Sequence, residues 1–198
     1  MRWTGWSTSA LLVSATLAAA TLAVAAEPQA KKPAAAAKFK LVSPDIAEGK
    51  TIATDQVFNA FGCTGKNLSP ALFWSGAPAG TKSFALSVYD PDAPTGSGFW
   101  HWVVYNIPAG TESLPAEAGD PKKKGMPVGA VQGRTDYGTF GYGGPCPPPG
   151  KPHHYYFRLF ALKVEKLEVP SDATAALIGY NVNANTIAKA ELVGLYGR

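Results

Sequence analysis

The sequence predicts a mainly β fold, a β-sandwich or β-barrel, for the part of the chain that follows its first 38 residues. The apolar segments there are short and rich in β-branched and aromatic residues. Clusters of glycine, proline, asparagine and aspartate separate them, which is typical of strands joined by turns. A helical pattern occurs only near the end of the chain. Mostly antiparallel strands with one or two late helices favour a sandwich or barrel over a doubly wound α/β fold.

Four segments carry the strand pattern most clearly: 39–43, 83–90, 101–108 and 153–162. The stretches between them, such as "PDAPTGSG" and "GYGGPCPPPGKP", consist largely of turn-forming residues. Near the end of the chain, Ser171 and Asp172 can cap a helix that begins at residue 173 and continues to residue 190. A last strand is expected at 191–197.

The beginning of the chain has the pattern of an export signal. Arg2 is the one charged residue before the end of the apolar run "ALLVSATLAAATLAVAA", which finishes in small residues. This pattern predicts a cleavable signal peptide at 1–26 and a periplasmic or secreted protein. A retained anchor is the alternative, but the run is weaker than the roughly 20 apolar residues of a spanning helix. Residues 27–38, "EPQAKKPAAAAK", have the composition of a disordered spacer, which leaves one domain at 39–198.

The net charge of +4 does not indicate a nucleic-acid-binding protein. Part of it comes from lysines in the predicted spacer, and part from a lysine run at 122–124. That run lacks the interleaved aromatic residues of a nucleic-acid surface, so a solvated loop is the better interpretation.

All three histidines follow directly after loops stiffened by proline and glycine. His101 is the last residue but one of the stretch "DPDAPTGSGFWHW", and His153 and His154 follow "GPCPPPGKP". Because strand ends gather at one pole of a sandwich, the two loops are expected to meet there. Strand alternation puts His153 and Tyr155 on one face, and His154 on the other. The alternative is that the carboxylates cap a turn and the histidines are half-buried strand residues.

Several segments together resemble the phosphatidylethanolamine-binding protein family, more narrowly its bacterial Raf-kinase-inhibitor-like branch. They are "NLSPALFWSGAPAGTKSFALSVYDPDAP", "HWVVYNIP", "GYGGPCPPPGKPHHYYFRLFAL" and the closing "AKAELVGLYGR". The similarity spans about residues 39–198. It implies a Greek-key β-sandwich of two antiparallel sheets, with a small pocket at one end that binds anions such as phosphate head groups.

The resemblance also implies a set of ligand-binding residues. They are Asp90, Asp92, Pro94, His101, Gly144, Pro148, His153 and Tyr155. The carboxylates are expected to orient the histidines and favour their charged forms, and a cis bond at Ala93–Pro94 is expected to lock the turn. The family commonly has arginine where this chain has His154. A structural pair between that arginine and a carboxylate is therefore in doubt here.

Two further expectations concern the cysteines and the class of function. Cys63 and Cys146 are expected to form a disulfide if the chain is exported, and two unpaired buried thiols are the alternative. The expected partners are a small anion or phospholipid head group and, as the family names suggest, a protease-like or kinase-like protein. A metal-dependent or acid/base hydrolase that uses the Asp/His cluster is the alternative. The sequence contains no H-E-x-x-H or G-x-S-x-G motif, and no cofactor is expected.

Overall fold

The structure, a computed structural model, describes residues 1–3, 5 and 38–198. Nearly all of the predicted signal peptide and of the predicted spacer lies outside these residues. Within the described part of the chain, no helix has the length and apolar character needed to cross a membrane.

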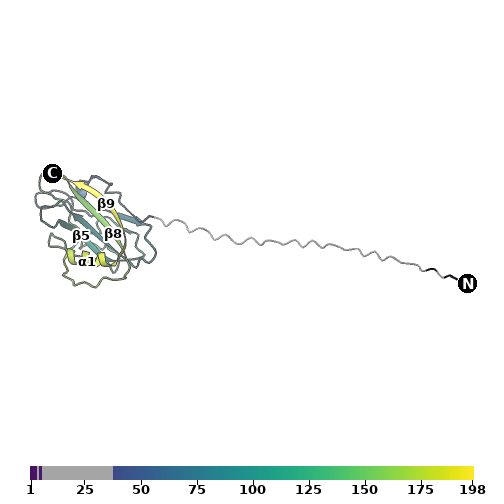
Figure 1. Cartoon of the computed structure of the whole chain (residues 1–198). Coiled ribbons are helices and arrows are strands. Elements are labelled where there is room, and N and C mark those ends of the chain that lie inside the picture. Colours follow the sequence, from purple (N-terminus) through teal and green to yellow (C-terminus); the bar gives the residue numbers. More distant parts are fainter. Residues whose placement is uncertain (4, 6–37) are drawn as a thin grey trace. The chain divides into compact units, whose positions relative to one another are not determined.

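Residues 38–198 fold into two β-sheets and one α-helix (Figure 1). The smaller sheet has the strand order β1-β3-β6, and the larger has the order β2-β9-β8-β4-β5-β7. The bounds of the strands are β1 Lys40–Val42, β2 Lys50–Thr51, β3 Leu72–Ser75, β4 Ser83–Asp90, β5 Phe99–Pro108, β6 Ser113–Leu114, β7 Val131–Gln132, β8 His153–Leu162 and β9 Thr186–Tyr196. A 3-10 helix, η1, covers Thr54–Gln56, and the helix α1 covers Ala175–Asn185.

The larger sheet has the long return connection of a Greek key. Strands β4 and β5 form an antiparallel hairpin, after which the chain makes a long excursion and returns as β8 on the other side of β4. The predicted mainly β sandwich with Greek-key topology is therefore confirmed. One pairing departs from the expected antiparallel arrangement, because the two-residue strand β2 pairs with β9 in parallel.

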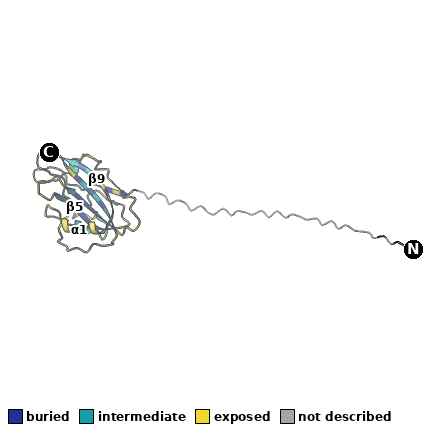
Figure 2. Ribbon diagram, viewed as in Figure 1, coloured by how far each residue is buried: buried dark blue, intermediate teal, exposed yellow. Residues whose placement is uncertain are grey.

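The central strands are buried on both faces, and this explains their nearly continuous apolar sequence. One core cluster lies between the two sheets and includes Trp102, Phe157 and Leu159. A second cluster lies on the other face of the larger sheet, where Ile178 and Val182 of α1 pack against it. Figure 2 shows the resulting burial along the strands.

The helix is shorter than the sequence predicts. It is capped by Thr174, whose hydroxyl accepts a hydrogen bond from the N–H of Leu177 at 3.2 Å, rather than by Ser171 or Asp172. It ends at Asn185, and the next residues already belong to β9, where Thr186 pairs with Leu162. The expectation of a helix over 186–190 is thus wrong. The β-branched residues Thr186 and Ile187 favour an extended backbone, and β8 provides the strand with which this segment pairs.

Candidate functional site

A cavity of about 230 Å³ lies at one end of the larger sheet. Six of the eight predicted binding residues line it: Asp90, Pro94, His101, Pro148, His153 and Tyr155. Asp92 and Gly144 do not. We call this cavity the pole pocket. His153 pairs with Tyr196 near the C-terminus, so the pole pocket lies at the end of the sheet where Figure 1 marks C, away from α1.

The pocket gathers the ends of three adjacent strands. Asp90 ends β4 and pairs with Phe99, which begins β5. On the other side of β4, Tyr89 pairs with Tyr156 at the start of β8, and this register brings His153 beside Asp90. Hydrogen bonding between neighbouring antiparallel strands therefore joins parts of the chain that are more than 60 residues apart.

Asp90 fixes the orientation of His153. The Nδ1–H of His153 donates to Oδ2 of Asp90 at 2.7 Å; the carboxylate is buried and the imidazole is 12% exposed. The other carboxylate oxygen of Asp90 accepts the backbone N–H of Asp92 at 2.8 Å. A buried carboxylate needs such partners. Because Nδ1 is committed to Asp90, the remaining ring nitrogen of His153, Nε2, is available to a ligand.

Asp92 anchors the acidic turn to β8 and does not line the pocket. Its Oδ2 accepts both the backbone N–H and the Nδ1–H of His154, at 2.8 and 2.7 Å. The hydrogen bond from His154 is the main reason why the pKa of Asp92 lies below its usual value. The doubt raised by the missing arginine is thereby resolved in the structure, since His154 itself pairs with the acidic-turn carboxylate.

A β-bulge aims His101 into the pocket. Val88 pairs with Trp102 whereas the next residue, Tyr89, pairs with Trp100, so His101 is the extra residue on β5. A bulge changes the alternation of side chains. Here it lets His101 line the pocket while the adjacent Trp102 packs fully buried in the core between the sheets.

His101 is held by a backbone carbonyl and not by a carboxylate, contrary to the sequence-based expectation. Its Nδ1–H donates to the carbonyl oxygen of Gly143 at 2.8 Å. The rings of Phe99, Tyr137 and Tyr155 surround the imidazole at centroid distances of 5.0 to 5.5 Å. This burial lowers the pKa of His101 despite the nearby Asp90, so the neutral form is favoured. Asp90 does favour the charged form of His101, as expected, but burial outweighs it and the pKa falls.

Tyr155 supplies a hydroxyl without a partner. Its side chain is fully buried, and none of the described residues meets its hydroxyl with good hydrogen-bond geometry, although the Asp90 carboxylate lies close by. Burial raises the pKa of Tyr155, and the negative charge of Asp90 adds to the effect, so the phenol stays protonated and can donate. Tyr137 differs, because its hydroxyl already donates to the carbonyl of Gly144 at 2.8 Å.

Gly144 packs against η1 and does not present its N–H to a ligand. That N–H donates to the side-chain oxygen of Asn67 at 2.7 Å. A Cβ atom at Gly144 would lie 2.0 Å from the carbonyl oxygen of Gln56, so only glycine allows the loop to pack against η1.

The bond between Ala93 and Pro94 is trans, and no cis peptide occurs among the described residues. The expected cis bond is therefore wrong. The hydrogen bonds of Asp90 and Asp92 to the backbone hold this turn instead.

A disulfide joins two walls of the pocket. Cys63 and Cys146 are bonded, with their Cα atoms 6.0 Å apart. Cys63 closes a tight turn in which its N–H donates to the carbonyl of Ala60, and Phe61 and Gly62 both have positive φ, 54° and 82°. Phe61 lines the pocket while remaining 73% exposed. A positive φ, as at Phe61, is rare for a bulky residue.

The sequence did not indicate two of the pocket aromatics, Phe61 and Tyr137. Tyr137 stacks on Phe58 at a centroid distance of 4.3 Å and lines the cavity beside His101. The one signal available was the presence of aromatic residues in two glycine-containing loops, "AFGC" and "DYGTFGYGG".

The geometry does not favour the alternative of a metal-dependent hydrolase. Within residues 38–198 and the few described residues before them, no three His, Cys, Asp or Glu side chains gather closely enough to hold a metal ion. Asp90 and Asp92 each bond a different histidine on opposite faces of β8.

Comparisons of the sequence with a family model and with individual proteins lead to the same family. Residues 42–197 match the model of the family described as phosphatidylethanolamine-binding protein. The chain is 56% identical to the UPF0098 protein YbcL of Escherichia coli over 164 residues, which is 82% of this chain and 90% of YbcL. It is 46% identical to the UPF0098 protein YbhB of the same organism, over 79% of this chain and 99% of YbhB.

Solved structures agree with these sequence matches. The crystal structure of E. coli YbcL, described as a new member of the mammalian PEBP family, superposes with a TM-score of 0.80 at 55% identity, covering 82% of this chain and 99% of that one. A phosphatidylethanolamine-binding protein homologue, CT736 of Chlamydia trachomatis, gives a TM-score of 0.67 at 32% identity, covering 81% and 97%.

Proposed function

Because the chain belongs to the phosphatidylethanolamine-binding protein family, we propose that the pole pocket binds a small phosphate-type anion, such as a phospholipid head group. The observation that carries this proposal is the fully buried hydroxyl of Tyr155, which has no hydrogen-bond partner among the described residues. A buried donor without an acceptor is costly, and a ligand oxygen would remove that cost.

The neighbouring groups determine which oxygens the pocket can hold. Tyr155 can donate to one ligand oxygen, and protonated His153 can donate from Nε2 to another while its Nδ1–H stays on Asp90. His101 has a different role. In its neutral form, with Nδ1–H on Gly143, its Nε2 is an acceptor. The pocket therefore suits an anion that carries one hydrogen-bond donor of its own, such as a monoprotonated phosphate or the ammonium of phosphoethanolamine.

The size of the pocket supports a head group and not a lipid chain. Its volume of about 230 Å³ lies below the roughly 300–1,000 Å³ of pockets for drug-sized ligands. Phe99, Pro94 and Pro147 provide apolar walls, which strengthen polar interactions inside by excluding water.

Alternation along β8 provides matched variants for a test. His153→Asn keeps a donor to Asp90 and removes Nε2, and Tyr155→Phe removes the spare hydroxyl. His154→Asn and Tyr156→Phe make the same changes on the opposite face. In calorimetric titrations with phosphoethanolamine, the first two variants should weaken binding by roughly tenfold each, and the two controls should not. Equal affinity in all four variants and the wild type would exclude the pole pocket.

We propose further that the protein is exported. The signal pattern at 1–26 and the Cys63–Cys146 disulfide both fit an oxidising compartment. N-terminal sequencing of the mature protein should begin near Ala26 or Glu27. A cytosolic protein that retains Met1 would contradict this part of the proposal.

A protein partner at the pole is a second candidate function. Phe61 is large, apolar and exposed beside the pocket mouth, and the disulfide-closed turn fixes it there. Such an aromatic residue can anchor a protein interface. Phe61→Ser should abolish binding to a protease or kinase-like partner, while phosphoethanolamine affinity should fall much less, because the hydrogen-bonding groups of Tyr155, His153 and His101 remain.

A further inference from the structure

A second cavity lies on the opposite face of the larger sheet, between the sheet and α1. Its volume is about 180 Å³, and none of its lining residues is shared with the pole pocket. We call it the helix-side cavity. Figure 1 shows α1 beside β5 and β8. Protein interiors leave few voids larger than one water molecule. Incomplete packing of α1 on the sheet therefore leaves space for a ligand.

Two rows of paired residues form the floor of this cavity. One row runs across the sheet from Ala85 through Phe160 to Lys189, and the neighbouring row runs from Ser87 through Arg158 to Glu191. Both rows face α1, since their members on β4 and β8, together with Lys189, line the cavity. On β4 and β8 the first row is apolar, with Ala85 and Phe160, and the second row is polar, with Ser87 and Arg158.

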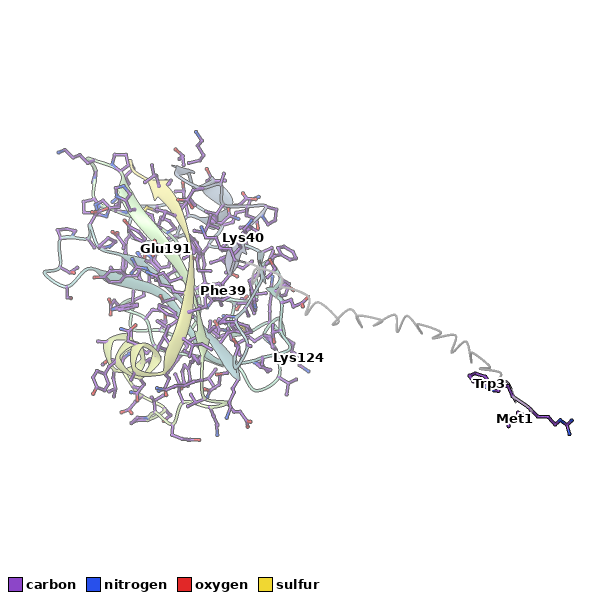
Figure 3. The ribbon with its side chains drawn as sticks, turned by 45° about the vertical axis from the view of Figure 1, so that its right-hand side comes forward. Met1, Trp3, Phe39, Lys40, Lys124 and Glu191 are labelled. Atoms are coloured by element: carbon purple, nitrogen blue, oxygen red, sulfur yellow. A yellow bond between two sulfur atoms is a disulfide. The ribbon has the colours of Figure 1, made fainter. Side chains whose placement is uncertain are left out.

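The polar side of the cavity carries an excess of positive charge. Arg158 donates from Nε to Glu191 Oε2 at 2.6 Å, and Lys189 Nζ lies 3.4 Å from the same oxygen. Two cations therefore share one carboxylate. Tyr156 helps to hold Arg158 in place, because the guanidinium carbon lies 4.5 Å from its ring centroid. Figure 3 labels Glu191 on β9. The free N–H groups of Arg158 and Lys189 can still donate to an anion.

The rest of the lining is apolar, with one hydroxyl that has no partner. Val103, Phe160, Ile178 and Val182 provide apolar surface. Ser87 also lines the cavity, and its buried hydroxyl forms no hydrogen bond with any residue in the described part of the chain. A buried polar group without a partner calls for an explanation, and a ligand oxygen would provide one.

We propose that the helix-side cavity binds a small amphipathic carboxylate of the short- or medium-chain fatty acid type. The chain would lie under α1 against the apolar lining, and the carboxylate would accept hydrogen bonds from Lys189, Arg158 and Ser87. A cationic ligand would meet Arg158 and Lys189 and is disfavoured. Long acyl chains do not fit a cavity of about 180 Å³. This inference is independent of the function proposed for the pole pocket.

Octanoate below its micellar concentration is a suitable probe, and octanol, which has the same chain without the charge, is its control. The purified protein should bind octanoate saturably at one site, and octanol more weakly, in calorimetric titrations. Lys189→Gln should weaken octanoate binding roughly fivefold. Lys163→Gln removes the charge of an exposed lysine outside the cavity and should have no effect.

Substitution of Gly179 offers a way to fill the cavity with a side chain from α1. It lies in α1 and lines the cavity, and a Cβ there would make only ordinary contact with Trp100, at 3.6 Å. Gly179→Leu should therefore abolish octanoate binding by occupying the space, whereas Gly179→Ala should leave most of it. Because the leucine variant can fail to fold, octanoate-induced chemical-shift changes should also be mapped in the unmutated protein, where Ser87, Trp100 and Gly179 should respond.

Three results would overturn the proposal: no saturable octanoate binding, unchanged binding in both Lys189→Gln and Gly179→Leu, or displacement of octanoate by phosphate. In the last case the chemical-shift changes would centre on His101 and His153, and the octanoate would occupy the pole pocket instead.

Discussion

The Nδ1 atom of His153 lies 2.7 Å from Oδ2 of Asp90, and together they form a largely buried pair that links the end of β4 to the start of β8. One residue further along β8, the exposed pair His154–Asp92 has the same 2.7 Å separation. The two pairs lie on opposite faces of β8 and have the same chemistry. Comparing them therefore separates the effect of burial on stability from the effect of the hydrogen bond itself.

Replacing Asp90 by asparagine should destabilise the fold more than replacing Asp92. Asp90→Asn weakens a buried, charge-assisted hydrogen bond, and the expected loss is roughly 2 kcal/mol of unfolding free energy. Asp92→Asn affects a partly exposed pair that solvent screens, so the expected loss is below about 1 kcal/mol. Urea denaturation of the two variants and the wild type measures the difference. Equal losses would show that burial of the Asp90 pair has no energetic consequence.

His101 should make the fold less stable in mild acid. Burial lowers its pKa in the folded protein, whereas in the unfolded chain it should titrate near pH 6.5. Below that pH the unfolded state binds the proton first, so unfolding becomes easier until the folded-state pKa is reached. One such group contributes a slope of at most about 1.4 kcal/mol per pH unit.

The measurement is a series of urea denaturations at pH values on either side of 6.5. His101→Asn keeps a donor for the Gly143 carbonyl and cannot titrate, so the difference in unfolding free energy between wild type and variant should narrow as the pH falls. A difference that is independent of pH would mean that His101 titrates alike in both states.

The disulfide should support both stability and the pocket. It closes a loop with a sequence separation of 83, and the chain-entropy model assigns a bond of this span about 4 kcal/mol. Cys63→Ser/Cys146→Ser should lower the unfolding free energy by up to this amount and weaken phosphoethanolamine binding, because Phe61 and Cys146 line the pocket. Two free thiols in the denatured, non-reduced protein would contradict the bond itself.

The sequence predicted the central strands with more success than the details of the site. The bounds 83–90 and 153–162 agree with β4 and β8, because long apolar runs between proline-rich and glycine-rich turns leave little choice of structure. The end of α1 was not predicted, since alanine, asparagine and threonine at 183–188 give no clear stop and the strand partner of Thr186 is distant in the sequence.

Within the site, short-range pattern and family resemblance indicated residues but not their roles. The bulge at His101 depends on how β5 pairs with β4, and the neutral state of His101 depends on Tyr137 and Tyr155, which come from other segments. For the same reason the sequence could not show that Gly144 bonds Asn67, or that Phe61 reaches the pocket mouth. Each of these features arises from contacts between residues far apart in the chain.

The neutral state of His101 leads to the sharpest prediction about the ligand. Methyl phosphate and methyl sulfate have similar shapes, and at about pH 5.5, below the second phosphate pKa of about 6, both are mostly monoanions. They differ in one proton, since only the phosphate carries an O–H, which Nε2 of His101 can accept in the neutral form that burial favours. Methyl phosphate should therefore bind more tightly, by roughly tenfold or more. The affinities follow from calorimetric titration at this pH.

His101→Asn removes Nε2 and should abolish the preference for methyl phosphate, while His154→Asn, on the other face of β8, should retain it. Equal binding of the two anions by the wild type would mean that His101 accepts no hydrogen bond from the ligand, and that the donors Tyr155 and His153 alone determine which anion the pole pocket takes.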